Sequence, residues 1–359
     1  MQIDNKEEEE ETKGTDVFST RQTAQKRVLS FLRSVHFRYI VTPSIILSIV
    51  AYASTISPNS WIVSDADHFY FEIFAVILST IVAFYCITRA YTLNEKFSLF
   101  VGIGFSTIAI IDLLHAVFSY AFVGNNQFLS YFIPQTWFAG RTFLGAMLVI
   151  AVAKYAPKVE KQDEQQIGGG GEEEQEEPHS VDIPTTHNDS DIKRRGGRSS
   201  EEKLHRGLLV SLFLLAFLAV SVVAISFFTI FPGIVVPYSL ARPYENPSLI
   251  LFSIALFLFY KKKLYNSNDA FYKGILGALL IDVFGQIIMS YSSMNFHTAH
   301  NVAHILKNSG YFIIIISLAI SSIQYNKLAK QREATIQSQY NKLKEMDRMK
   351  DEFINVAAH

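Results

Sequence analysis

The chain has 359 residues, of which 49% are hydrophobic and only 18% are charged, and its formal net charge is -1. A soluble protein usually carries about a quarter charged residues, and a nucleic-acid binder needs a basic surface, so this composition excludes both classes. Only 8 of the 33 acidic residues lie outside 1–38, 156–205 and 324–359. The composition therefore indicates an integral membrane protein in contact with the lipid bilayer. The single cysteine, Cys86, excludes a disulfide framework.

The first half of the chain contains a polar arm and four apolar segments. Residues 1–38 are polar and partly basic, and we interpret them as a disordered cytoplasmic arm. Segments long and apolar enough to cross the hydrocarbon then fill most of 39–155, at 39–57, 68–90, 97–121 and 135–155. These segments predict the first four transmembrane helices of a bundle.

A polar linker separates these helices from a second apolar half. The stretch 156–205 holds a glycine run and an acidic block, a composition that cannot bury enough apolar area to fold, and we predict that it is disordered and cytoplasmic. The region 206–323 then contains four more apolar segments, at 207–231, 247–260, 271–292 and 302–323. The sequence thus predicts an all-α fold, a polytopic bundle of about eight transmembrane helices.

The last part of the chain changes to charged, helix-forming residues. Within 324–348 and the following turn, Leu343, Met346 and Phe353 fit a short heptad pattern. This pattern predicts a cytoplasmic coiled-coil signalling helix that joins two copies of the chain into a homodimer.

Lysine and arginine residues are concentrated in alternate connections. The connections between the second and third, fourth and fifth, and sixth and seventh segments are basic, whereas 58–67, 122–134, 232–246 and 293–301 contain one basic residue, Arg242. Because basic loops stay in the cytoplasm, we predict a multi-pass protein of the plasma membrane with both termini in the cytoplasm.

Polar residues inside the apolar segments gather in the outer half of the predicted bundle. They are His68, Glu72, Asp112, His115, Gln135, Trp137, Arg141, Asp282, His300, His304 and Lys307. A charge in hydrocarbon needs a partner or water, so these residues predict a binding site for a ligand or signal. We expect Asp112 to pair with Arg141, and Glu72 or Asp282 to pair with a protonated histidine or with Lys307.

The chemistry of this set leaves several uses open. Imidazole and carboxylate groups are ligands for zinc, copper and iron, so His68, His115, His300 and His304 are candidate metal ligands. The same groups suit a small polar ligand, pH sensing through histidine protonation, or simple bonding between helices.

The end of the chain carries a motif with a known resemblance. The run 349–359 resembles the start of the phosphoacceptor (HisKA) domain of sensor histidine kinases, in which Phe stands six residues before the phosphorylated His. Phe353 and His359 match that spacing. The resemblance implies that His359 is a catalytic phosphoacceptor that receives a phosphoryl group from ATP with Mg and passes it to a cognate response regulator. No nucleotide-binding lid occurs in these 359 residues, so we predict no ATP cofactor and no kinase activity for them alone.

The apolar part of the chain has a second resemblance, to the third type of membrane-associated sensor (MASE) domain. It rests on short motifs in order, namely His68 with Glu72, Asp112-Leu113-Leu114-His115 with Tyr120, Gln135-Thr136-Trp137 with Arg141, and the run 300–307. It covers about 56–323, with 156–205 as an unusual insertion. The resemblance implies an integral-membrane signal-input module placed before kinase or cyclic-dinucleotide output domains.

Two functions follow from these patterns. In the first, the chain is the input region of a two-component sensor kinase, and a stimulus at the outer polar cluster reaches His359 through the last transmembrane helix. In the second, the chain is a membrane metal-binding enzyme or ion transporter that uses the same histidines and carboxylates.

Overall fold

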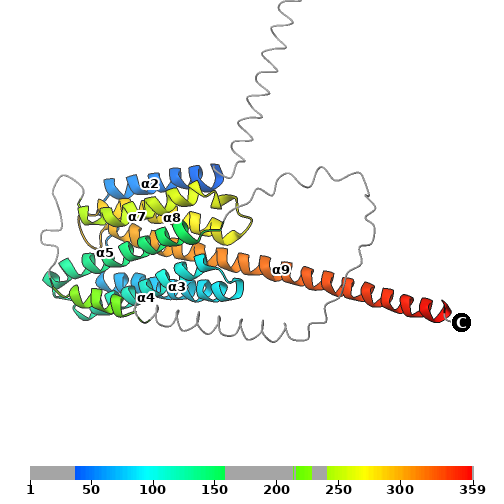
Figure 1. Ribbon diagram of the computed structural model, residues 1–359. Helices are drawn as coiled ribbons and strands as arrows, with labels where there is room; N and C mark the ends of the chain where they lie inside the picture. The colour runs from blue at the N-terminus through cyan, green and yellow to red at the C-terminus, as the bar shows by residue number, and fades with distance from the viewer. Residues whose placement is uncertain (1–36, 158–212, 214–215, 229–240, 358–359) are drawn as a thin grey trace, which may run out of the picture.

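The structure is a computed structural model that describes residues 37–157, 213, 216–228 and 241–357, and its regular elements there are all helices (Figure 1). The all-α prediction is therefore confirmed. The main helices are α2 (Thr42–Ile56, after a π-helical turn at Phe37–Val41), α3 (Asp65–Leu93), α4 (Lys96–Ala121), α5 (Asn126–Ile150, continued by a π-helical turn at Ala151–Tyr155), α7 (Asn246–Lys261), α8 (Ala270–Ser290) and α9 (Thr298–Ala357). Short 3-10 turns occur at Pro243–Glu245 and Leu264–Asn266.

Six helices of the described part are long and apolar enough to cross a membrane. They are Phe37–Ile56, Asp65–Leu93, Lys96–Ala121, Asn126–Tyr155, Ala270–Ser290 and Thr298–Ala357. The predicted sixth segment is α7, which has 16 residues, and the described part of the predicted fifth segment contains the shorter apolar helix Ala216–Ile225. A multi-helix membrane protein is confirmed, whereas the number of passes and the cytoplasmic side of the termini stay predictions.

The arm at 1–36, most of the linker at 158–205 and the predicted phosphoacceptor His359 lie outside the described residues.

The outer surface of the bundle is apolar. Ile49 on α2, Phe84 on α3, Phe257 on α7 and Phe312 on α9 are all more than half exposed. Large exposed apolar surfaces are rare on soluble proteins and are typical of a surface that lies against lipid acyl chains. In the interior, aromatic and branched side chains from α3, α4, α5, α7, α8 and α9 form the largest hydrophobic cluster of the described residues, and two smaller clusters are separate from it.

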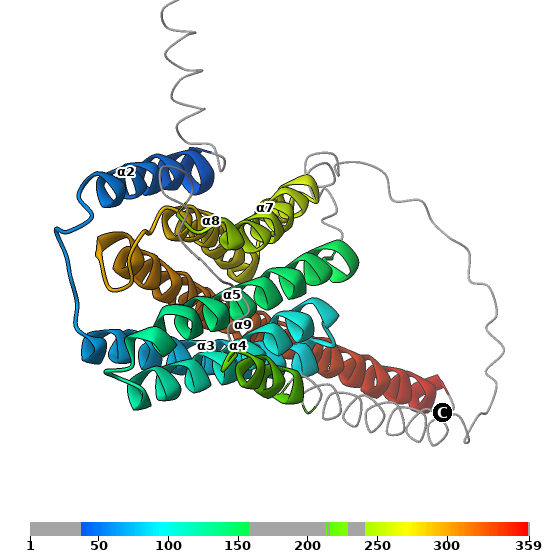
Figure 2. The ribbon, with the colours of Figure 1, turned by 90° about the vertical axis from the view of Figure 1, so that its left-hand side faces the viewer.

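Helix α9 is the central element. It packs against α8 and α3, and in both views it runs through the bundle before it extends beyond it (Figures 1 and 2). After Ser321, which is itself buried, the side chains of α9 are exposed, and the helix continues without a break to Ala357. The last predicted transmembrane segment and the predicted stalk are therefore one helix of 60 residues.

The connections between helices lie at two opposite ends of the bundle. At one end, the backbone N–H of Val63 donates to the Phe296 carbonyl at 3.0 Å, and that of Arg242 donates to the Ser290 carbonyl at 2.9 Å. At the other end, Lys262 Nζ donates to the Ala153 carbonyl at 2.8 Å. The basic connections that we used to predict orientation therefore share the end from which the stalk emerges.

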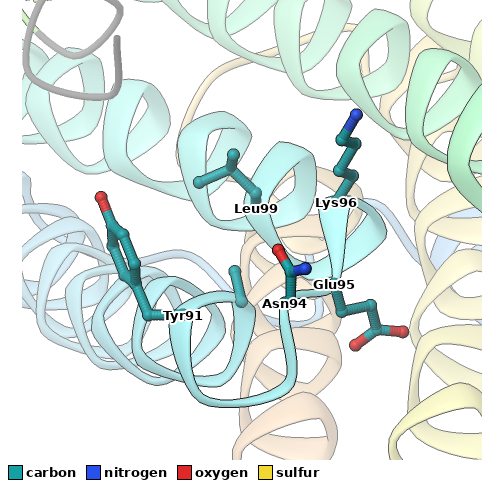
Figure 3. Close-up of a pocket in the computed structure, with 6 residues that line it drawn as sticks. Tyr91, Asn94, Glu95, Lys96 and Leu99 are labelled. Carbon is teal, nitrogen blue, oxygen red and sulfur yellow. The ribbon is translucent and has the colours of Figure 1, made fainter. Parts of the chain in front are cut away.

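Local sequence signals explain the α3–α4 hairpin. Ser64 and Asp67 cap the start of α3 with a reciprocal pair of hydrogen bonds, which satisfies N–H groups that the first helical turn leaves free. The helix ends where Asn94 adopts a left-handed conformation with φ 51°, which asparagine tolerates better than most residues. The resulting turn lines a small pocket (Figure 3).

The start of α5 differs from the sequence prediction. We expected this segment to begin at 135, after Pro134, but α5 begins at Asn126 and continues through the proline. Asn125 caps it by accepting from the Phe128 N–H at 3.0 Å. Proline is tolerated within membrane helices where neighbouring groups compensate for the lost backbone bond. Residues that we placed at the outer end of a segment therefore lie well inside α5.

The close contact of α8 with α9 depends on Gly274. A Cβ atom at this position would overlap the side chain of Ser317 on α9, whereas a Cβ at Gly277 would lie 3.6 Å from Ile313, an ordinary contact. We expect Gly274→Ala to destabilise the bundle by about 1–3 kcal/mol, because the two helices must separate. Gly277→Ala is the matched control and is expected to leave thermal stability in detergent nearly unchanged. Equal melting temperatures for the two variants would contradict this packing.

Candidate functional site

The predicted polar residues of the membrane segments are buried in the bundle. Each of His68, Glu72, Asp112, His115, Gln135, Trp137, Arg141, Asp282, His300, His304 and Lys307 is at most 7% exposed. They come from α3, α4, α5, α8 and α9. All of them except Gln135 belong to two ion-pair groups, a histidine cluster and an aromatic side chain between them.

The first ion-pair group is centred on Lys307 of α9. Its Nζ atom lies 2.8 Å and 3.0 Å from the two carboxylate oxygens of Glu72 and 3.4 Å from Oδ2 of Asp112. Nδ1 of His304 lies 2.7 Å from Oε1 of Glu72. The predicted pairing of Glu72 with Lys307 is confirmed, and a histidine lies beside the same carboxylate, whereas Asp282, the other carboxylate considered for these partners, pairs with an arginine.

The second group is centred on Arg141 of α5. Its guanidinium forms an ion pair with Asp282 of α8 and lies 3.4 Å from the hydroxyl of Tyr311. With the amide of Gln286 oriented to satisfy its neighbours, its oxygen accepts from Arg141 Nε at 2.9 Å and its nitrogen donates to Glu245 at 3.0 Å. Arg141 thereby connects α5 with α8, α9 and the turn before α7.

The predicted pairing of Asp112 with Arg141 is wrong. Asp112 on α4 contacts Lys307, and Arg141 takes Asp282 as its partner. The position of a residue along a helix does not determine how that helix is rotated about its axis. The rotation of α4 directs Asp112 towards α9.

Trp137 lies between the two cations. Lys307 Nζ is 4.8 Å and the Arg141 guanidinium carbon is 5.8 Å from the centre of the indole ring. The face of an indole ring attracts cations, so Trp137 stabilises both charges and links the two groups.

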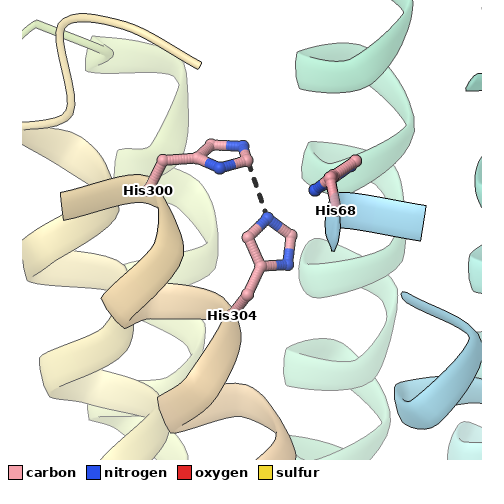
Figure 4. A group of neighbouring side chains, drawn as sticks. All are labelled: His68, His300 and His304. Carbon is pink, nitrogen blue, oxygen red and sulfur yellow. Dashed lines mark hydrogen bonds between the residues drawn. The ribbon is translucent and has the colours of Figure 1, made fainter. Parts of the chain in front are cut away.

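Four histidines form a cluster beside the Lys307 group. His68 is central, with ring centres 4.9 Å from His304, 5.3 Å from His300 and 5.7 Å from His115. Figure 4 shows His300 and His304 on adjacent turns of α9, with His68 reaching towards them from α3. Nε2 of His300 lies 3.3 Å from Nε2 of His304. Phe296 packs against His68 and His300.

Several of these ring nitrogens have no hydrogen-bond partner among the described residues. They are both ring nitrogens of His68, Nε2 of His115, and Nδ1 of both His300 and His304. His115 is held on its other side, because its Nδ1 bonds to the hydroxyl of Thr136. Two sets of groups lie close enough to hold a metal ion, with ligand atoms within 4.8 Å of one another: His68, His300 and His304, and His68, Glu72 and His115.

Gln135 does not join this cluster. Its amide nitrogen donates to the carbonyls of Ser226 and Phe228 at 3.1 Å and 3.0 Å, so it ties α5 to the segment 216–228. The sequence prediction that Gln135 shares a site with the other polar residues is not supported by these contacts.

Two residues of the polar network were not predicted from the sequence. Glu245 is fully buried beside Gln286, although we had assigned it to a connection outside the apolar segments. Tyr311, also buried, was indistinguishable from the other aromatic residues. An available signal for Glu245 was its position two residues before Pro247, at the start of the predicted sixth helix.

A second polar contact network lies at the stalk end of the bundle. Arg89 of α3 bonds to Asp269 at 2.5 Å, to Glu95 at 3.0 Å and to Ser321 of α9 at 2.5 Å. In Figure 3, the Glu95 side chain points away from Tyr91, which lines the same pocket. We name Arg89, Glu95, Asp269 and Ser321 the basal clamp, since they fix the base of the stalk to α3 and α8.

Comparison with known families supports a sensor role for this arrangement. The family model of the membrane-associated sensor domain, MASE3, matches residues 66–325. The chain belongs to the MASE3 family. The matched range contains the ion-pair groups, the histidine cluster and the basal clamp, and it ends where the stalk leaves the bundle. This MASE3 domain is thus an all-helical membrane sensor domain that contacts the lipid bilayer. No curated protein and no solved structure matches the chain.

Proposed function

We propose that this MASE3 domain is the signal-input region of a two-component sensor histidine kinase in the plasma membrane. A stimulus at the buried polar cluster shifts the position of α9, and the shift reaches His359. The observation that carries this proposal is the continuity of α9, which holds His300, His304 and Lys307 inside the bundle and extends without a break to Ala357.

The contacts of α9 support a mechanical relay. Within the bundle, α9 is held by the ion pair of Lys307 with Glu72, and at its base by the bond of Ser321 to Arg89. Tyr325 adds a second basal contact, since its ring lies 5.1 Å from the Arg89 guanidinium. A helix held at two levels transmits a rotation or a piston movement when one level changes, because its backbone hydrogen bonds keep it stiff.

The chemical output is phosphoryl transfer. A ring nitrogen of His359 attacks the γ-phosphorus of ATP, forms an N–P bond and displaces ADP, and the phosphoryl group then passes to an aspartate of a cognate response regulator. ATP and Mg belong to the catalytic domain of the complete kinase. The match of Phe353 and His359 to the phosphoacceptor box supports this assignment.

Pairing of two stalks is part of the proposal. Leu343, Met346 and Phe353 are between 55% and 74% exposed on the single helix and recur at heptad spacing. Exposed apolar side chains in this pattern favour a parallel two-helix coiled coil. Light scattering of the purified chain is expected to give the mass of two copies, and a monomeric mass would contradict the pairing.

A chimeric kinase tests the relay. The chain is joined after His359 to the remaining dimerisation and ATP-binding domains of a characterised sensor kinase, and labelling by radioactive ATP is measured in membranes. We expect labelling that His359→Gln abolishes. Inserting two residues after Gln337 rotates the lower stalk by about 200° and is expected to change basal labelling several-fold, whereas inserting seven residues restores the helical phase to within about 20°.

The substitution and the insertions can each contradict the proposal. Equal labelling of the wild-type chimera and the His359→Gln variant would show that His359 is not the phosphoacceptor. Equal labelling of the two-residue and seven-residue insertions would show that the orientation of α9 does not control the output.

A further inference from the structure

We propose that His68, His300 and His304 bind one divalent first-row transition-metal ion of the zinc and copper class. The inference deepens the proposed function, because it names a ligand for the polar cluster, and it rests on that function only for the signalling role of the ion. The binding itself is a property of this chain.

The distances between the imidazoles suit a metal ion. Nε2 of His300 and Nε2 of His304 are 3.3 Å apart, and the ligand atoms of all three histidines lie within 4.8 Å of one another. A zinc–nitrogen bond is about 2.0–2.1 Å long, so two ligands of a tetrahedral site are about 3.3–3.4 Å apart. The His300–His304 pair already has this separation. A ligand atom of His68 lies within 4.8 Å of both, so His68 is placed to supply a third ligand.

Glu72 orients His304 for this role. Nδ1 of His304 faces the Glu72 carboxylate at 2.7 Å, which directs Nε2 of the same ring towards His300. Histidine ligands of metal ions usually donate their other ring N–H to a carboxylate or carbonyl, and the Glu72 carboxylate lies within the distance of such a bond from His304 Nδ1. Lys307 binds both oxygens of Glu72 and keeps the carboxylate in place. Glu72 is therefore a positioning residue rather than a ligand.

His68 supplies an independent observation. Its side chain is 2% exposed, and neither ring nitrogen has a hydrogen-bond partner among the described residues. Buried polar groups in proteins are almost always satisfied, so an imidazole with two unpartnered nitrogens in the centre of three other imidazoles requires an explanation. The contact between the two Nε2 atoms gives one ring nitrogen each of His300 and His304 a partner, whereas His68 has none among the described residues. A bound metal ion satisfies His68 as well.

The surrounding charge and donor type select the ion. Glu72 and Asp112 share one cation, Lys307, which leaves one negative charge in excess next to the histidines and favours a bound cation. The donors are imidazole nitrogens, which zinc, copper and nickel prefer, whereas calcium and magnesium require oxygen ligands. The other close set, His68, Glu72 and His115, is less suitable because Lys307 occupies both oxygens of Glu72.

Metal analysis of the purified protein tests the proposal. The full chain is isolated in detergent through a tag without histidine, stripped with a chelator, incubated with Zn²⁺, Cu²⁺, Ni²⁺, Ca²⁺ or Mg²⁺, desalted and analysed by mass spectrometry. We expect about one transition-metal ion per chain and no retained calcium or magnesium. In the electron paramagnetic resonance spectrum of the copper form, we expect nitrogen couplings from several imidazoles. A wild-type chain that retains no transition metal would overturn the site, and this result does not depend on any variant.

Substitutions then locate the bound ion. His304→Ala and His68→Ala are expected to lower metal retention at least tenfold, whereas His297→Ala is expected to leave it unchanged. His297 is the matched control, because it lies near the cluster but bonds to Asn59 at 2.9 Å instead. Glu72→Gln is expected to weaken metal affinity about 10–100-fold while the imidazole couplings remain.

Two controls keep the interpretation clear. Replacing the histidines outside the described residues with Asn, at 36, 179, 187, 205 and 359, is expected to preserve the bound ion, and loss of the ion in that variant would place the ion elsewhere. Retention by His304→Ala equal to that of wild type would also overturn the site. Metal is counted without any kinase domain, so failure of metal binding and failure of the labelling experiment are separate results.

Discussion

Lys307→Met is expected to lower the free energy of unfolding by about 3–5 kcal/mol, because removing one partner of a buried ion pair leaves the other charge uncompensated. Lys307 is 2% exposed, and it is the cation that faces both Glu72 and Asp112. Met keeps an unbranched apolar stem, so the change removes the charge together with its attraction to the Trp137 ring. Equilibrium unfolding in mixed micelles, followed by tryptophan fluorescence, measures the effect.

The controls for Lys307 separate charge from general disturbance. Lys96→Met removes a lysine at the exposed start of α4 and is expected to change stability by less than about 0.5 kcal/mol. Adding Glu72→Gln to Lys307→Met removes one of the two stranded carboxylates, and we expect it to recover part of the lost stability. Equal stability of the Lys307→Met and Lys96→Met variants would show that the buried ion pairs do not stabilise this bundle.

The sequence was sufficient to locate the polar cluster, because charges in hydrocarbon are rare and each one is informative. Placing His68, Asp112 and His304 by their depth in the membrane was enough to predict that they meet in one part of the bundle. Choosing ion-pair partners required more. From the sequence alone, Asp112 and Asp282 are equally possible partners for Arg141. Only the rotation of α4 and α8 about their axes shows that Arg141 pairs with Asp282.

The basal clamp shows a different limit of sequence reasoning. Arg89 lies near the end of a predicted transmembrane segment, where basic residues are common and usually indicate orientation only. The sequence contains no sign that Arg89 meets Asp269, which lies 180 residues further along the chain. Its contacts depend on the folded arrangement of α3 against α8 and α9. Likewise, we placed the fourth segment at 135–155 from its apolar residues, whereas α5 already begins at Asn126 and contains Pro134.

Helix α9 is held at two levels, at the polar cluster inside the bundle and at the basal clamp. Its upper turns carry ligands of the proposed metal site and the lysine of the ion-pair group, whereas its base bonds to the clamp through Ser321. An ion bound at His300 and His304 would hold the upper turns against α3. Gain or loss of that ion would then alter the position of α9 relative to the clamp, and this is the movement that the proposed relay requires.

Replacing Arg141 is expected to lower the free energy of unfolding about as much as replacing Lys307. Arg141→Met leaves Asp282 buried without a cation and removes the bonds to Tyr311 and Gln286, so we expect a loss of about 3–5 kcal/mol in the free energy of unfolding. Arg141→Lys keeps the charge but cannot reproduce the several directed bonds of a guanidinium, and an intermediate loss is expected.

A double-mutant cycle decides whether the Arg141 effect comes from its ion pair. Asp282→Asn removes the negative partner, and the loss in the double variant Arg141→Met/Asp282→Asn is expected to be at least 1 kcal/mol smaller than the sum of the single losses. The matched comparison is Arg348→Met on the stalk, where the ion pair with Glu352 is 3.3 Å long but its side chains are 79% and 64% exposed. Water and salt screen that pair, so its removal is expected to cost about 0–1 kcal/mol. Additive losses at Arg141 and Asp282 would mean that this arginine stabilises the bundle through packing on Phe252 rather than through its charge.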